Sequence, residues 1–260
     1  MQVFRHFPLS SNAPIGLTIG NFDGVHIGHQ ALIEKLIAES KKRKLTPAVM
    51  TFEPHPKEFF TPENAPTRLT TLREKLEFFL DYGIEKVFVC AFNQKFSNIS
   101  SEVFIHQILI EQLKAELLIV GDDFRFGTKR QAGIEDLRKN AFELFEIPEI
   151  DVNGKRVSST RIREGLKQGR IEEVNQFLGR PYTISGKVVE GDKRGRQMGF
   201  PTANIHMKHL RPALTGVYAV KLGNRNGVAN LGVRPTISGT PKLLLEVHLL
   251  NFNEDIYGQH

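Results

Sequence analysis

The chain has 260 residues, of which 40% are hydrophobic and 25% charged, enough apolar mass for one large or two ordinary globular domains. Its 35 basic and 29 acidic residues give a net charge of +6, which suits small anionic ligands and does not require a nucleic-acid partner. No apolar run approaches the roughly 20 residues that span a bilayer, and the first residues contain no secretory signal core.

Cys90 is the single cysteine, and it lies within the apolar run 87–91. We expect a buried and unreactive strand residue there. One cysteine cannot form a disulfide framework within the chain, which is typical of a reducing compartment. The composition therefore predicts a cytoplasmic protein that acts on small molecules, without nucleic-acid or membrane partners. We also expect a monomer or weak oligomer, although composition does not determine the oligomeric state.

Up to about residue 180, short apolar runs alternate with helical patterns. This alternation predicts an α/β fold: a Rossmann-like, doubly wound parallel sheet with helices on both faces. Ligands of such folds bind at the carboxyl ends of the strands. We expect strands at 15–19, 47–52, 86–91, 117–120 and 144–147, and helices at 27–43, 71–82, 101–114 and 131–142.

The segment Gly-Asn-Phe-Asp-Gly-Val-His-Ile-Gly-His (20–29) joins the first predicted strand to the first predicted helix. His26 and His29 are three residues apart, so they share a face at the helix N-terminus, where anions are attracted. Gly28 has no Cβ to obstruct a ligand, and each imidazole can donate to a phosphate oxygen. We therefore predict a nucleoside triphosphate site; a helix that merely begins with two histidines is the alternative. The residues before the two histidines are assigned to the same nucleotide site: Gly20, Asn21, Phe22, Asp23 and Gly24.

Two later loops also follow predicted strands at this edge. In Gly-Asp-Asp-Phe-Arg-Phe-Gly (121–127), Asp123 can bind hydroxyls, and Phe124 and Phe126 can stack on a flat ring. The alternative is a turn with two aromatic rings in the core. His55 stands between two prolines that restrict the backbone, and we expect a supporting role for it.

Ser-Ser-Thr-Arg-Ile-Arg (158–163) opens another predicted helix. The plain interpretation is an N-cap followed by two arginines. Basic residues are unfavourable at the positive end of a helix unless an anion offsets them. Ser159, Thr160 and Arg163 therefore favour a phosphate-binding helix terminus.

From about residue 181 the helical patterns stop, and short β-like runs recur between glycines. This pattern predicts a small antiparallel β-barrel. We expect its strands at 184–190, 203–205, 217–222, 227–231 and 243–250, and we divide the chain into domains 1–180 and 181–260.

A glycine-rich segment leads into Pro-Thr-Ala-Asn (201–204). Gly191, Gly195 and Gly199 would let backbone amides approach phosphates closely. Thr202 and Asn204 lie on one face of an extended strand and offer a hydroxyl and an amide oxygen to Mg²⁺. A glycine-rich barrel corner without a ligand is the alternative.

Together, these motifs resemble the bacterial bifunctional riboflavin kinase/FAD synthetase family. The first half is similar to its FMN adenylyltransferase module, which implies ATP at the two histidines, further triphosphate contacts from Ser159, Thr160 and Arg163, and FMN as the acceptor. Pro-Thr-Ala-Asn resembles the riboflavin kinase signature. The resemblance implies that riboflavin is phosphorylated to FMN, and FMN adenylylated to FAD, with Mg²⁺ and ATP.

The resemblance also matches Glu246 to the catalytic base of the kinase, which would deprotonate the ribityl 5′-hydroxyl. From the sequence alone, a paired structural carboxylate is equally consistent. Family members continue for roughly fifty residues beyond Asp-Ile-Tyr-Gly (255–258), so an exposed edge strand and an incomplete kinase domain are expected. The alternative is then that only the adenylyltransferase is active. Two further rivals are another His-x-Gly-His nucleotidyltransferase and a non-catalytic flavin-sensing or nucleic-acid-binding protein.

Overall fold

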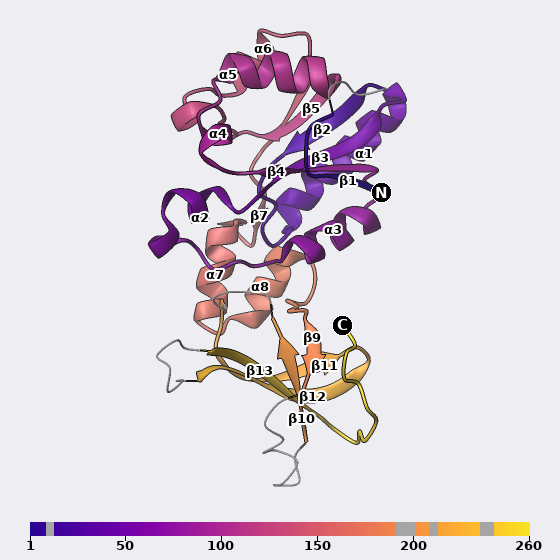
Figure 1. Ribbon diagram of the computed structural model, residues 1–260, viewed down its shortest axis with the longest axis vertical. Coiled ribbons are helices and arrows are strands. Elements are labelled where there is room, and N and C mark those ends of the chain that lie inside the picture. Colours follow the sequence, from indigo (N-terminus) through magenta and orange to yellow (C-terminus); the bar gives the residue numbers. More distant parts are fainter. Residues whose placement is uncertain (9–12, 191–200, 208–212, 235–241) are drawn as a thin grey trace. The chain divides into compact units, whose positions relative to one another are not determined.

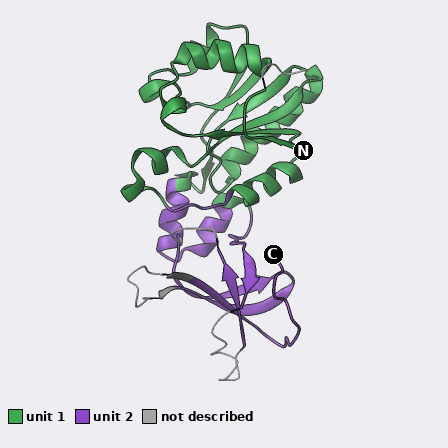
Figure 2. Cartoon of the chain, viewed as in Figure 1, with its two compact units in different colours: residues 1–66, 72–159, 177–179 green, residues 67–71, 160–176, 180–260 purple. Residues whose placement is uncertain are grey.

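The computed structural model describes residues 1–8, 13–190, 201–207, 213–234 and 242–260. The chain divides into two compact units, which are described separately (Figure 2). The first comprises residues 1–66, 72–159 and 177–179, and the second comprises residues 67–71, 160–176 and 180–260.

The first unit is built on a six-stranded sheet in which every neighbouring pair is parallel (Figure 1). Its order is β1-β4-β3-β2-β5-β6, so the strand order reverses beside β2. In open α/β sheets, ligands bind at the carboxyl end of such a switch point. The strands are β1 (Gln2–Phe4), β2 (Ile15–Ile19), β3 (Thr46–Glu53), β4 (Lys86–Ala91), β5 (Ala115–Gly121) and β6 (Glu143–Ile147).

Helices cover both faces of this sheet, which confirms the predicted doubly wound architecture. On one face, Leu36 of α1 and Phe79 of α3 belong to the same buried cluster as Val49 and Leu117. Leu109 of η2 belongs to the cluster on the other face. The helices are α1 (Ile27–Arg43), α2 (Pro56–Phe60), α3 (Leu72–Asp81), α4 (Gln94–Ser97), α5 (Ser101–Val103), η2 (Phe104–Gln112) and α6 (Ile134–Arg138), with short turns η1 (Pro62–Asn64) and η3 (Thr128–Arg130).

Several elements differ from the sequence predictions. The helix expected at 101–114 continues from α5 into the wider, π-type turn of η2. The helix expected at 131–142 shortens to α6, because Gly133 N–H donates to the Asp136 carboxylate at its start and β6 already begins at Glu143. A small hairpin of β7 (Asp151–Val152) and β8 (Lys155–Arg156) was missed, although its Asn-Gly turn is a hairpin signal.

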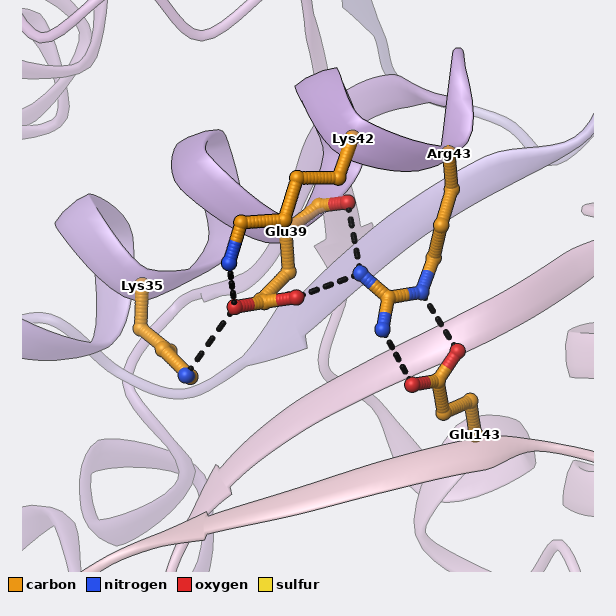
Figure 3. Close-up of polar contacts among 5 residues, drawn as sticks. All are labelled: Lys35, Glu39, Lys42, Arg43 and Glu143. Carbon is orange, nitrogen blue, oxygen red and sulfur yellow. Dashed lines mark hydrogen bonds and ion pairs between the residues drawn. The ribbon is translucent and has the colours of Figure 1, made fainter.

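An ion network fixes the C-terminal end of α1 to β6 (Figure 3). Lys35 Nζ and Lys42 Nζ lie 3.1 and 2.8 Å from Glu39 Oε1. The Arg43 guanidinium bonds both the Glu39 carboxylate and that of Glu143, the first residue of β6. Glu39 is only 4% exposed, so this network makes a buried carboxylate part of the contact between helix and sheet.

The second unit contains an antiparallel sheet of order β11-β12-β13-β10-β9, as predicted for the second half. One face of the sheet is buried and apolar, with Ala229, Leu231, Leu245 and Val247. The strands are β9 (Lys187–Val189), β10 (Thr202–His206), β11 (Gly216–Leu222), β12 (Arg225–Arg234) and β13 (Lys242–Leu249), and helices α7 (Ser159–Lys167) and α8 (Ile171–Leu178) precede them.

Cys90 is buried at 5% exposure within β4, which confirms the prediction of a buried strand residue. Burial raises the pKa of its thiol, as expected for an unreactive cysteine. Across the ranges that the structure describes, no helix is both long and apolar enough to cross a membrane.

Candidate active sites

The loop after β2 has a strained backbone at the switch point of the sheet. Phe22 and Val25 have φ of 49° and 40°, a left-handed conformation that side chains with a Cβ rarely adopt, and Gly24 has φ of 87°. Strain of this kind persists only where the surroundings hold it, and it concentrates at functional sites.

Side chains from four other elements hold the carbonyl groups of this loop. The Asn21 carbonyl accepts hydrogen bonds from Thr51 Oγ1 and Lys75 Nζ, each at 3.3 Å. The Asp23 carbonyl accepts from Ser159 Oγ at 2.8 Å, and the Val25 carbonyl accepts from Gln30 Nε2 at 2.8 Å. In a trans peptide, the next N–H points opposite to the carbonyl. The amides of residues 22, 24 and 26 therefore point away from these supports, as an anion-binding loop requires.

His26 and His29 lie ring on ring at the start of α1. Their centroids are 3.6 Å apart with an angle of 16° between the planes, as the spacing of three residues predicts. His26 is the N-cap, and its Nδ1 accepts the His29 N–H at 3.3 Å. This bond assigns the proton of a neutral His26 ring to Nε2, which makes Nε2 a donor.

The position of the His26 ring requires a residue without a side chain at position 28. A Cβ at this position would lie 3.2 Å from both Cε1 and Nδ1 of His26. The absence of a side chain therefore leaves space for the ring itself, in addition to any space for a ligand.

Two aromatic contacts connect the loop to the histidines and to α3. The Phe22 ring is fully buried and meets His29 edge-on, with centroids 5.2 Å apart. On its other side it meets Phe79 of α3 at 5.4 Å and 89°. The loop conformation and the position of the His29 ring are thus coupled.

Asn21 carries a polar atom that suits a ligand. Its side-chain oxygen is buried, and it makes no hydrogen bond within the part of the chain that the structure describes. An unsatisfied buried acceptor is costly, so a donor group of a bound molecule would be favourable there.

The residues predicted to bind the flavin differ from one another in their burial and in their contacts. Phe126 is 7% exposed and belongs to the hydrophobic core, and Phe124 stacks on it with centroids 5.6 Å apart. The Asp123 carboxylate is exposed and pairs with Arg156 at 3.3 Å. His55 is the N-cap of α2, and its Nδ1 accepts the Lys57 N–H at 3.1 Å. The flavin contacts of these residues remain predictions.

The predicted triphosphate residues at 159–163 fall on either side of the division into units. Ser159 belongs to the first unit, where it bonds the Asp23 carbonyl. Thr160 and Arg163 belong to the second unit, where Arg163 Nε donates to the Thr67 carbonyl at 2.6 Å. Their part in binding the triphosphate remains a prediction.

The second candidate site lies on the polar face of the antiparallel sheet. Thr202 pairs directly with His248, and Asn204 pairs with Glu246, in the ladder between β10 and β13. Side chains of directly paired residues share a face, so these four polar side chains lie together. His248 Nδ1 lies 2.9 Å from the Pro201 carbonyl and therefore carries the proton that it donates. Gly191, Gly195 and Gly199 lie outside the described residues.

The donor atoms of this second site are suited to Mg²⁺. A threonine hydroxyl, an asparagine amide oxygen and a carboxylate are hard oxygen ligands, which this ion prefers. Within the described ranges, no cluster of three or more His, Cys, Asp or Glu side chains has the arrangement of a metal site. A metal here would thus depend on few protein ligands, together with substrate phosphates.

Three supports behind the loop, Thr51, Lys75 and Gln30, were not predicted from the sequence. The pattern did contain a signal for Lys75. It occupies a position on the apolar stripe of α3, together with Leu72, Leu76 and Phe79, where a lysine is unexpected.

Comparisons with known proteins cover both halves of the chain. A family model described as FAD synthetase matches residues 9–161, and one described as riboflavin kinase matches residues 178–260. A bifunctional riboflavin kinase/FMN adenylyltransferase of Escherichia coli (strain K12) is 44% identical, over 100% of this chain and 87% of its own length. The protein of the same name from Haemophilus influenzae is 42% identical, over 94% of this chain and 82% of its own.

One solved structure shares the fold throughout. It is described as a macrolide-efflux protein from Streptococcus pneumoniae, has a TM-score of 0.85 at 27% identity, and covers 99% of this chain and 88% of that chain.

Proposed function

The chain belongs to the bifunctional riboflavin kinase/FMN adenylyltransferase family, and from this premise we propose how its residues divide the two reactions of FAD biosynthesis. It phosphorylates riboflavin to FMN and adenylylates FMN to FAD, with ATP as the donor in both steps. Because a riboflavin kinase model matches residues 178–260, the alternative of an active adenylyltransferase alone is not favoured.

We assign adenylyl transfer to the first half, on the strength of the stacked histidines beside the strained loop at the switch point. The loop amides and the N-terminus of α1 would bind the triphosphate of ATP. His26 and His29 would donate to its phosphate oxygens, and Ser159, Thr160 and Arg163 would add further contacts. His55, Asp123 and Phe124 are the proposed flavin contacts, with Phe126 supporting Phe124 from the core.

The adenylyl transfer needs no covalent enzyme intermediate. An oxygen of the FMN phosphate attacks the α-phosphorus of ATP, a new P–O bond forms, and the bond between the α-phosphorus and the α,β-bridging oxygen breaks to release pyrophosphate. Because nucleophile and leaving group are both anionic, the main task of the site is to hold them together and offset their charge. Removing one such contact commonly costs on the order of 10²-fold in rate.

Riboflavin phosphorylation is assigned to the second half. The ribityl 5′-hydroxyl attacks the γ-phosphorus of ATP, its proton passes to the Glu246 carboxylate, and ADP leaves. Thr202 and Asn204 would hold Mg²⁺, which when bound supplies neutralisation of the phosphate charge. The glycine-rich segment would contribute amides from Gly191, Gly195 and Gly199.

We also propose that the protein is cytoplasmic, that small molecules are its only partners, and that the boundary between its domains lies near residue 180. They rest on composition and on the change of pattern along the chain.

The assignment is tested by incubating the protein with riboflavin, ATP and Mg²⁺ and separating FMN from FAD by chromatography. A parallel reaction supplied with FMN isolates the adenylyl transfer. We expect His29→Ala to abolish FAD formation and to leave FMN formation intact. Equal loss of both products in this variant would contradict the two-site assignment.

A further inference from the structure

We infer that Lys75 is a positioning residue for adenylyl transfer, holding the Asn21 peptide so that the following amide is presented to the triphosphate. This inference rests on the proposed function of the Gly20–Gly24 loop. It concerns a side chain on α3, outside the histidine motif and outside every motif that the sequence singled out.

The first observation is the burial of a charged group. Lys75 is 2% exposed, and it is the one lysine among the described side chains that is fully buried. Burying an ammonium group is costly unless polar partners offset it. Its Nζ lies 3.3 Å from the Asn21 carbonyl, so the buried charge is directed at the loop after β2.

The second observation is that Thr51 is directed at the same atom. This residue, in β3, is fully buried, and its hydroxyl donates to the Asn21 carbonyl at 3.3 Å. Two buried donors from separate elements thus fix the orientation of one peptide group. The next residue, Phe22, has the strained φ of 49°, which needs this kind of support.

The third observation is that α3 supports the loop at two points. Lys75 and Phe79 are four residues apart and share a face of the helix. Lys75 holds the Asn21 carbonyl, and the Phe79 ring packs against Phe22, which in turn meets His29. A change at Lys75 would therefore be transmitted to both the loop amides and a histidine ring.

These contacts have a consequence for the chemistry. The Phe22 N–H belongs to the same trans peptide as the Asn21 carbonyl and points away from Lys75. A cation hydrogen-bonded to the carbonyl polarises that peptide, because hydrogen bonds in a chain strengthen one another. Lys75 would therefore make the Phe22 N–H a better donor to an anion.

The test compares Lys75→Met, which keeps a long, unbranched side chain but removes the ammonium group with its charge and donors, with the near-isosteric Thr51→Val. Arg73→Met is the matched control, since Arg73 is an exposed cation in the same turn of α3. For each variant, the steady-state constants for ATP and FMN are measured in FAD formation. Riboflavin phosphorylation by the same protein and thermal unfolding are measured alongside.

We expect Lys75→Met to lower kcat/KM for ATP on the order of 10²-fold, and Thr51→Val on the order of tenfold, because small displacements of a positioned group carry such costs. The KM for FMN and the riboflavin kinase activity should not change, and Arg73→Met should match the wild type. Calorimetric titration with α,β-methylene ATP should show weaker binding to Lys75→Met.

A purely structural role predicts a different result. Lys75→Met would then unfold at a lower temperature but keep wild-type constants for ATP wherever it is folded, and this outcome would overturn the inference. If Lys75→Met does not fold, Thr51→Val decides the question by the same measurement. A wild-type protein that forms no FAD would instead refute the proposed function, so the two failures are distinguishable.

Discussion

Asn204 and Glu246 are direct partners in the antiparallel ladder between β10 and β13. Asn204 is a proposed Mg²⁺ ligand and Glu246 the proposed base, so the register of two strands sets the distance between the proposed metal site and the proton acceptor. Glu246 also pairs directly with Asn230 on its other side. The carboxylate is therefore flanked by amide side chains on the polar face of the sheet.

Glu246→Gln is expected to abolish most riboflavin phosphorylation. Glutamine keeps the shape but cannot accept the proton, and general-base catalysis contributes on the order of 10²- to 10⁴-fold. The rate of FMN formation from riboflavin is the measurement, and FAD formation from supplied FMN should be unchanged. Glu254→Gln is the control, because Glu254 is an exposed carboxylate of the same unit that pairs with Arg225. Full kinase activity in Glu246→Gln would remove this residue from the mechanism.

Gly28→Ala is expected to slow FAD formation without destabilising the protein. Gly28 lies in the first turn of α1, whose N-cap is His26. The helix-propensity gain of alanine, at most about 1 kcal/mol, therefore offsets a weakened His26 cap, and the unfolding temperature should change little. The new Cβ would, however, press on Cε1 and Nδ1 of His26 at 3.2 Å. We therefore expect FAD formation to slow by about tenfold, as misplaced contact groups do, while riboflavin kinase activity is retained.

The control for this variant is Glu34→Ala, an exposed substitution on the same helix. It should change neither reaction. If Gly28→Ala formed FAD at the wild-type rate, the position of the His26 ring would not limit the reaction.

Local pattern was sufficient to predict most of the first unit. The apolar runs at 15–19 and 86–91 and the helix at 27–43 coincide with β2, β4 and α1, because each has a clear period and a polar boundary. β1 was missed because it is three residues long and is stabilised by parallel pairing with β4, far along the chain. Such pairing leaves little trace in three residues.

The candidate site was predictable only in part, for a related reason. His26 and His29 are close in sequence, so helical spacing alone places them together. Lys75 and Thr51 reach the Asn21 carbonyl from 54 and 30 residues away, and no local period encodes that meeting. The cross-strand pairs of β10 and β13 depend in the same way on register, which the sequence of either strand leaves open.

Cys90 is expected to resist thiol reagents in the folded protein. It is buried in β4, and desolvation raises the pKa of its thiol, so little reactive thiolate forms. A colorimetric disulfide reagent at mildly alkaline pH should therefore label no thiol in native protein and one per chain after denaturation. Rapid labelling of the native protein would show that β4 opens on the time scale of the assay.

The network around Glu39 predicts a stability that depends on pH. Hydrogen bonds from Lys42, Arg43 and Lys35 lower the pKa of the Glu39 carboxyl from 4.5 to about 2. Arg43 also lowers the pKa of Glu143. A carboxyl whose pKa is depressed by folding stabilises the folded state above its ordinary pKa, and this contribution is lost as the pH falls through the folded value.

Glu39→Gln should therefore lower the unfolding temperature of the protein at neutral pH, and its difference from the wild type should shrink as the pH falls from 4.5 toward 2. Thermal unfolding followed by circular dichroism across this range measures the difference directly. Glu77→Gln is the control, since Glu77 forms an exposed pair with Arg73, and such pairs contribute little. Because other carboxyls titrate in both proteins, only the difference between them reports on Glu39. A difference that stayed constant over the range would mean that the charge of Glu39 does not hold α1 against β6, and that the contact depends on packing alone.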